Sequence, residues 1–429
     1  MTLAVGPILG FRGSKNGEWH TCALVVAEEG AEPPKLRWSV DGDQNESDAE
    51  CKDLKSFDGL RAWRFEWGVE QVEREREVAY ALTGEDASYS YSVPAKDQPP
   101  RIAYGSCAGF HDPKDMRYVT GNTNAMWEDL ARRHRDEGAY HLLLMGGDQV
   151  YADQLWEAVP QLKRWIGKPL EEMADEQLTE DTLDHIGRFY SDLYCERWGQ
   201  EEPAWVMSRV PGLMMWDDHD IFDGWGSKST ALQNTRVYEQ IYEKARDYFS
   251  LFQLQAKDDE DLPAAMLLDP DAQGERKNLT YAYRIGDDVA LAMLDMRSER
   301  TRERVMGTET WQALHAWMRE ELDGCKHLLV VSSIPVVYVD SNMLESSVGW
   351  VPGQKHLEDD FRDRWQSRAH LQERLRLIHD LFDLAKDKHC RPTIVSGDVH
   401  LAALGQYRGS STAARPPRRT PSCSSSPRP

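Results

Sequence analysis

The chain has 429 residues, 40% of them hydrophobic and 29% charged, and its formal net charge is −22. This composition is typical of a globular protein that is long enough for a large core and an accessory domain. The acidic excess argues against stable nucleic-acid binding, because phosphate backbones attract basic surfaces. It leaves small phosphate esters open as substrates, since a bound metal ion reverses the local charge.

Residues 1–98 are rich in short strand-like runs, such as HTCALVVA (20–27) and AWRFEWGV (62–69), separated by Gly, Pro, Asp and Asn. Such spacing predicts a small N-terminal β-sandwich domain of the immunoglobulin or fibronectin type. The Pro-rich residues 94–100 then predict a linker.

In residues 99–407, predicted strands alternate with predicted helices, which is typical of an α/β domain. The strands are expected at 101–107, 140–148, 212–218, 289–297, 327–337 and 392–398, and the helices at 122–138, about 230–254, 308–324 and about 359–388. A helical insertion is expected around 153–210. Residues 408–429 are rich in Ser, Pro and Arg and predict a disordered tail.

Targeting signals are not evident in the sequence. No stretch approaches the roughly 20 apolar residues that a membrane-spanning helix needs, and the first residues lack the pattern of a signal peptide. The seven cysteines are scattered without a zinc or disulfide pattern. These features predict a cytoplasmic protein with reduced thiols and no membrane span.

Chemically active side chains follow five of the predicted strands. Ligands of α/β sheets bind outside the carboxyl ends of the strands, so these side chains are expected to form one site. They are Cys107; Asp148, Tyr151 and Asp153; Asp217, Asp218 and His219; Asp295 and Arg297; and Asp398 and His400.

Converging carboxylates imply bound cations, because an unpaired buried carboxylate costs several kcal/mol or more. Oxygen ligands suit Ca²⁺, Mg²⁺ or Mn²⁺, imidazole suits zinc or iron, and thiolate or phenolate suits Fe³⁺. The set of Asp, His, Cys and Tyr therefore predicts mixed metals.

Five motifs carry a resemblance to a known family. They are GSC (105–107), GDQVYAD (147–153), WDDHD (216–220), LDMRSER (294–300) and SGDVH (396–400). In this order they resemble the PhoD-type alkaline phosphatases of the metallophosphoesterase superfamily. The resemblance covers residues 101 to about 405. It implies a two-sheet metallophosphatase sandwich flanked by helices, preceded by the small β-sandwich domain.

The resemblance also implies roles. Cys107 and Tyr151 would bind Fe³⁺, Asp148 would bridge two metals, and Asp218, Asp398 and His400 would be further ligands. The implied metals are Fe³⁺ and Ca²⁺, with Zn²⁺, Mn²⁺ or Mg²⁺ as alternatives. Asp217, Asp220 and Asp223 would orient the ligands.

Two residues are expected to act on the substrate. His219 would protonate the leaving group, and Arg297 would hold the phosphate, because a guanidinium fork matches phosphate geometry. The predicted function is a metal-dependent hydrolase in which a metal-activated hydroxide attacks a small phosphomonoester or phosphodiester.

Structural roles are the alternatives. Cys107 and Tyr151 would then be packing residues, Asp153 a helix cap, and Arg297 the partner of a structural carboxylate. The alternative function is a non-catalytic or truncated scaffold that keeps the metallophosphatase fold. The residues that follow SGDVH, rich in Ser, Pro and Arg, motivate it. The oligomeric state is not predicted.

Overall fold

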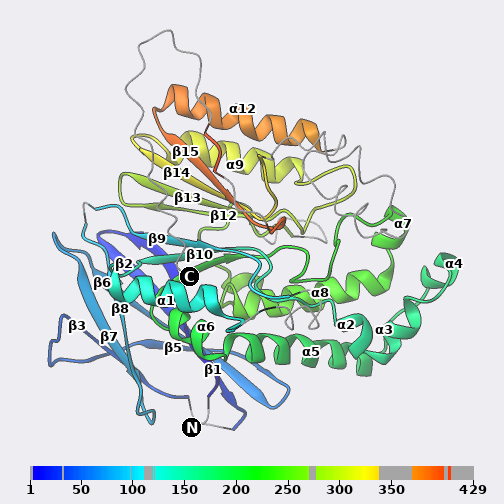
Figure 1. Ribbon diagram of the computed structural model, residues 1–429, viewed down its shortest axis with the longest axis horizontal. Coiled ribbons are helices and arrows are strands. Elements are labelled where there is room, and N and C mark those ends of the chain that lie inside the picture. The colour runs from blue at the N-terminus through cyan, green and yellow to red at the C-terminus, as the bar shows by residue number, and fades with distance from the viewer. Residues whose placement is uncertain are drawn as a thin grey trace, which may run out of the picture.

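The computed structural model describes residues 3–30, 33–96, 98–110, 119, 121–269, 277–337, 370–400 and 404–406. The predicted tail at 408–429 and the beginning of the helix predicted at 359–388 lie outside the described residues. The fold is mixed α/β, as the alternation of strands and helices predicts (Figure 1). Within the described part of the chain, no helix is long and apolar enough to cross a membrane.

The largest sheet has seven strands in the order β5-β6-β2-β1-β11-β10-β9. They are β1 (Leu3–Lys15), β2 (Glu18–Glu28), β5 (Glu50–Phe57), β6 (Leu60–Glu70), β9 (Ile102–Gly105), β10 (Leu142–Gly146) and β11 (Gly212–Met215). The N-terminal strands join the later ones where β1 lies parallel to β11, with Gly10 opposite Gly212. The domain boundary expected near residue 98 therefore does not coincide with a boundary between sheets.

A smaller antiparallel sheet contains the other N-terminal strands, in the order β4-β3-β7-β8. These are β3 (Leu36–Val40), β4 (Ser47–Asp48), β7 (Arg76–Leu82) and β8 (Ser88–Val93). It packs on the large sheet through buried aromatic rings: Trp67 Nε1 donates to the Tyr91 hydroxyl at 2.8 Å. The N-terminal region thus has two packed β-layers, but one of them continues into the core.

The third sheet, in the order β12-β13-β14-β15, faces the large sheet. Its strands are β12 (Tyr281–Ile285), β13 (Val289–Leu294), β14 (His327–Ser332) and β15 (Arg391–Ser396). The side chains alternate along β13. Leu291 and Met293 belong to the core between the two sheets, whereas Ala290 and Ala292 pack under helices on the outer face.

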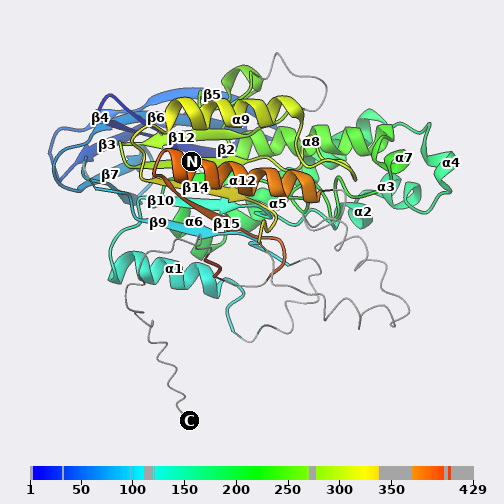
Figure 2. The same ribbon diagram turned by 90° about the horizontal axis from the view of Figure 1, so that it is seen from above.

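Helices cover the outer faces of both facing sheets. Figure 2 shows α9 (Thr308–Glu321) and α12 (Leu371–Asp387) running alongside each other over the third sheet. On the large sheet, α5 (Glu180–Trp198) and α6 (Glu201–Met207) contact β1. In addition, α1 (Ala125–Asp136) packs on α6, and α8 (Arg236–Phe252) packs on α5.

The segment predicted as a helical insertion is helical. Besides α5 and α6 it contains α2 (Leu155–Ala158), α3 (Pro160–Trp165) and α4 (Leu170–Met173). The single helix expected at about 230–254 is divided into α7 (Thr230–Gln233) and α8. The division has a local cause: the Thr235 side chain accepts a hydrogen bond from the Tyr238 backbone and starts a new helix.

Candidate functional site

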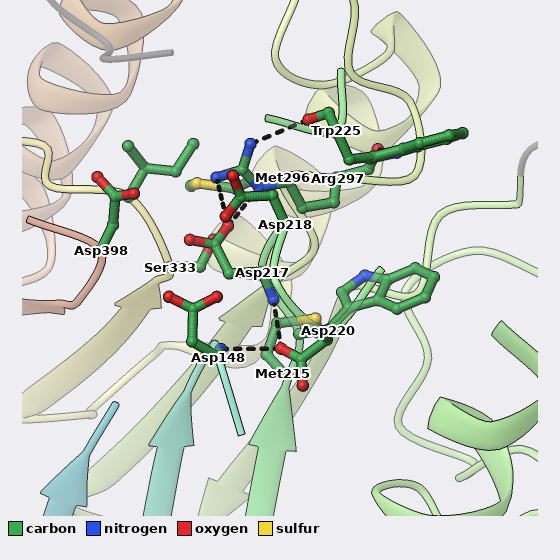
Figure 3. A network of polar contacts seen from close by, with 12 residues as sticks. Asp148, Met215, Asp217, Asp218, Asp220, Trp225, Met296, Arg297, Ser333 and Asp398 are labelled. Carbon is green, nitrogen blue, oxygen red and sulfur yellow. Dashed lines mark hydrogen bonds and ion pairs between the residues drawn. The ribbon is translucent and has the colours of Figure 1, made fainter. Parts of the chain in front are cut away.

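The predicted site residues converge where the strands of the two facing sheets end (Figure 3). Cys107 follows β9 and Asp148 follows β10 in the large sheet, and Asp217 to His219 follow β11. From the third sheet, Asp398 and His400 follow β15. These residues therefore lie together, since parallel strands deliver their ends to one edge, and their roles at the site stay a prediction.

Among the residues that the structure describes, three groups of side chains are placed so that each could hold a metal ion. Within each group the ligand atoms lie within 4.8 Å of one another. The groups are Cys107, Asp148 and His400; Asp148, Asp218 and His219; and Asp217, Asp218 and Asp398. Asp148 belongs to the first two groups and Asp218 to the last two, so shared carboxylates connect the whole series. The Tyr151 hydroxyl lies 3.1 Å from His400 Nε2, at the edge of the first group.

The backbone is left-handed at four of these positions. The φ angles are 55° at Cys107, 56° at Asp148, 70° at Asp398 and 52° at His400. Asp and His tolerate this region better than most residues, but a non-glycine residue there still stores strain, of the order of 1–3 kcal/mol. Such strain is typical of functional sites, because the surrounding structure must enforce it.

Gly147 precedes Asp148 and allows the two loops after β10 and β11 to approach closely. Its φ is 111°, and a Cβ atom there would lie 2.7 Å from Asp217 Cβ. The loop after β9 is tied to the same place, because the Cys107 amide donates to the Gly147 carbonyl at 2.9 Å. Gly147 therefore lets the candidate ligands from three strands gather.

Asp220 is a structural carboxylate. Its side chain accepts hydrogen bonds from the backbone amides of Asp148 (2.8 Å), Gln149 (3.1 Å) and Asp217 (2.9 Å), and from Gln253 Nε2 (2.9 Å). Burial raises the pKa of Asp220 to about 7. Its side chain thus joins the loop after β10 to the loop after β11. The two dashed lines to Asp220 in Figure 3 are the hydrogen bonds that its Oδ2 accepts from the amides of Asp148 and Asp217.

Arg297 lies behind the acidic residues, and none of its surface is exposed. Its guanidinium forms an ion pair with Asp217, and its Nη2 lies 3.2 Å from Asp218 Oδ1. Nη1 donates to the Trp225 carbonyl at 3.1 Å. Ser333 adds a 2.7 Å hydrogen bond to Asp217. This geometry corresponds to the alternative role for Arg297, as partner of a structural carboxylate.

His219 is held on two sides. Its Nδ1 lies 2.7 Å from Asp153 Oδ2, and its ring stacks on Tyr151 with centroids 4.4 Å apart. Burial lowers the pKa of His219, but the charge of Asp148 and the hydrogen bond to Asp153 outweigh it and raise the pKa well above its ordinary value. The sequence placed Asp153 among the side chains expected at the site, with a helix cap as the alternative, and gave it no role toward His219; its place at the end of GDQVYAD was the available signal.

The residues present fit bound metal ions. Asp148 is 1% exposed, and its Oδ1 is buried without a hydrogen bond from any described residue. Its Oδ2 has a 3.5 Å contact with the Cys107 thiol. Burial raises the pKa of the Asp148 carboxyl well above its ordinary value, and a cation would restore its charge. Thiol, imidazole and carboxylate donors together suit iron or zinc beside a harder ion such as Ca²⁺.

Comparisons with known proteins agree with the resemblance read from the motifs. The family model of the PhoD related phosphatases matches residues 74–356, a range that contains Cys107, Asp148 and His219 and ends before Asp398. A solved structure of PhoD has a TM-score of 0.55 at 14% identity, and the match covers 92% of this chain and 71% of that one. That likeness concerns the fold alone.

A curated relative is an uncharacterized protein of Saccharomyces cerevisiae, strain S288c. It is 29% identical over 409 residues, and the match covers 83% of this chain and 58% of the relative. The chain therefore spans less than two thirds of that relative's length.

Proposed function

Because the chain belongs to the PhoD related phosphatase family, we propose that it is a metal-dependent phosphatase that hydrolyses a small phosphate ester at this site. The observation that carries the proposal is Asp148, a buried carboxylate shared by two groups of candidate ligands. Bound cations would make this concentration of buried carboxylates favourable in their ionised form.

We assign Cys107, Asp148 and His400 to one metal position, with Tyr151 beside it. Asp148 and Asp218, extended by Asp398, supply the second. Thiolate and phenolate favour Fe³⁺ at the first position and carboxylates favour Ca²⁺ at the second, with Zn²⁺, Mn²⁺ or Mg²⁺ as alternatives. The metals would offset the carboxylate charge, polarise the phosphoryl group and lower the pKa of water.

His219 is the proposed general acid. Because Nδ1 is engaged by Asp153 at 2.7 Å, the proton that His219 transfers to the leaving oxygen is the one on Nε2. The Tyr151 ring restricts the imidazole to one plane. Asp153 is therefore a positioning residue that fixes the tautomer of His219.

Arg297 is also proposed as a positioning residue. Its guanidinium lies between Asp217 and Asp218 and is fully buried, so a phosphate could reach it only by displacing one of these carboxylates. In this role Arg297 fixes the direction in which Asp218 presents its oxygens, and it takes no part in substrate binding.

The test uses the full chain, treated with chelator and then reconstituted with iron plus calcium, zinc, manganese or magnesium. Release of 4-nitrophenol from 4-nitrophenyl phosphate and from bis(4-nitrophenyl) phosphate separates monoester from diester activity. We expect hydrolysis by the reconstituted wild type, its loss in Asp148→Asn, and full activity in Asp184→Asn, which changes an exposed residue of α5. A folded, metal-loaded chain that hydrolyses neither ester would contradict the proposal and favour the scaffold.

A further inference from the structure

Arginines and aromatic rings form a stack on the surface that joins α1, α6 and β8. The guanidinium carbons of Arg135 and Arg209 lie 4.7 Å and 4.5 Å from the Trp205 ring centroid. Arg209 also lies over Tyr89 at 5.5 Å, and Tyr89 stacks on buried Tyr80 at 5.2 Å. The series therefore runs from the core to the exposed Arg135.

The two arginines have no carboxylate within ion-pair distance among the residues that the structure describes. Asp136, the neighbour of Arg135 in the chain, forms no ion pair with it, and Asp129 and Glu137 pair with Arg132 and Arg133 instead.

The hydrogen bonds of the stack leave most guanidinium donors available. Arg209 donates from Nη1 to the Trp205 carbonyl and to Ser208 Oγ, and no described residue accepts from Arg135. Both guanidiniums lie over rings, and their remaining N–H groups can bind an anion, which a guanidinium holds with two parallel hydrogen bonds.

Arg101 adds positive charge beside this stack, and the lowered pKa of the neutral His134 reflects its burial and the positive surroundings. Arg101 lies over Tyr140 at 5.6 Å, and His134 contacts Trp205 edge-on at 5.8 Å. Burial lowers the pKa of His134 to about 4, and the charges of Arg209, Arg101 and Arg135 contribute. In a chain with a net charge of −22, this surface is a local positive region, and the repulsion between its cations is relieved when an anion binds.

The stack is separate from the candidate metal centre. Arg101 precedes β9, and its backbone amide donates to the side chain of His141, which precedes β10, at 2.8 Å. The stack therefore adjoins the N-terminal ends of strands whose carboxyl ends bear Cys107 and Asp148. A ligand bound there does not compete for the metal ligands.

We propose that Arg135, Trp205 and Arg209 form a docking surface for a phosphorylated peptide segment of a partner protein. A phosphate group carries about −1.5 to −2 charges at neutral pH, which two guanidiniums neutralise. A nucleic acid or an anionic membrane would extend past this region onto acidic surface and be repelled. A short peptide segment meets only the local positive charge, because charges farther away than about 8–10 Å are screened at physiological salt.

The test is fluorescence anisotropy with a labelled peptide of neutral residues that carries one phosphonate analogue of phosphoserine, which a phosphatase cannot hydrolyse. Arg135→Glu removes the exposed end of the stack. Arg164→Glu is the matched control, because Arg164 is also exposed in the last turn of a helix and forms no ion pair with a described residue. We expect Kd to rise about tenfold or more in Arg135→Glu and less than about twofold in Arg164→Glu. Arg135→Lys, which keeps the charge but loses the fork, should fall between them.

Three outcomes would overturn the proposal. The first is equal affinity of Arg135→Glu and Arg164→Glu for the peptide. The second is binding that is lost in Asp148→Asn and kept in Arg135→Glu, which would place the peptide at the metal centre. The third is tighter binding of an oligodeoxythymidine or of phosphatidylserine vesicles than of the peptide. Unchanged thermal unfolding of Arg135→Glu is the control for folding, and none of these readouts depends on phosphatase activity.

Discussion

The Asp153 carboxylate lies 2.7 Å from His219 Nδ1, although 66 residues separate the two in the chain. The other oxygen of Asp153 accepts the Asp223 amide at 2.7 Å. Asp153 thus connects the loop after β10 to the loop after β11 and fixes the side chain of His219 through Nδ1. The catalytic account depends on this pair more than on any other contact outside the metal ligands.

Replacing Asp153 tests the pair directly. Asp153→Asn keeps the size of the side chain but removes the charge that holds the His219 tautomer, so kcat should fall about 10- to 100-fold with little change in KM. The measurement is kcat against pH with 4-nitrophenyl phosphate, in which the limb due to His219 should also move. Metal content should stay at the wild-type value; its loss would instead make Asp153 part of the metal centre.

Replacing Arg297 separates the two roles considered for it. Arg297→Met leaves the buried carboxylates of Asp217 and Asp218 without their cation, so the free energy of unfolding of the chelator-treated protein should fall by about 3–5 kcal/mol. Urea denaturation measures this. A phosphate-binding arginine would behave differently, with stability preserved and a large rise in KM, and that pattern would contradict the assignment.

Asp220 should matter for stability through its hydrogen bonds. In Asp220→Asn an NH₂ group replaces one of the two oxygens. In place of Oδ2 it cannot accept from the backbone amides of Asp148 and Asp217, and in place of Oδ1 it cannot accept from the Gln149 amide and Gln253 Nε2. Buried donors left without acceptors cost about 1–3 kcal/mol each, so the urea midpoint should drop clearly. Asp184→Asn on α5 is the exposed control and should keep the wild-type midpoint. An equal midpoint for both variants would show that Asp220 does not hold the loops.

The pH dependence of stability should contain a contribution from His134. Burial lowers its pKa to about 4 in the folded protein, whereas a histidine in an unfolded chain titrates near 6.5. As the pH falls below about 6.5 the unfolded state takes up the proton first, so stability present at neutral pH is lost towards pH 4. Thermal unfolding at pH 7, 6 and 5 should therefore decline less steeply in His134→Gln than in the wild type. Parallel curves would contradict this.

The composition of the site could be predicted from the sequence because it depends on strand order. Cys107, Asp148 and Asp218 each follow an apolar run, and parallel strands end at one edge. The helical insertion and the outer helices could be predicted for a different reason. Hydrophobic periodicity and helix caps are local signals, so they can be read within each segment.

Other features depend on pairing between distant residues, which local patterns do not encode. The contact of Gly10 with Gly212 makes the N-terminal strands part of the core sheet, yet neither segment indicates its partner. Likewise, nothing in LDMRSER shows that Arg297 turns inward to Asp217. The left-handed backbone at Cys107 is also invisible in the sequence, because cysteine is not a residue that favours it.

The most direct measurement is the metal content of the purified wild type, prepared without chelator, beside Asp148→Asn, with each metal counted per chain by elemental analysis. The account predicts stoichiometric metal in the wild type, iron together with calcium under the proposed assignment, and its loss when the shared carboxylate of Asp148 becomes an amide. A folded wild-type chain without stoichiometric metal, or an Asp148→Asn protein that keeps its full complement, would contradict it.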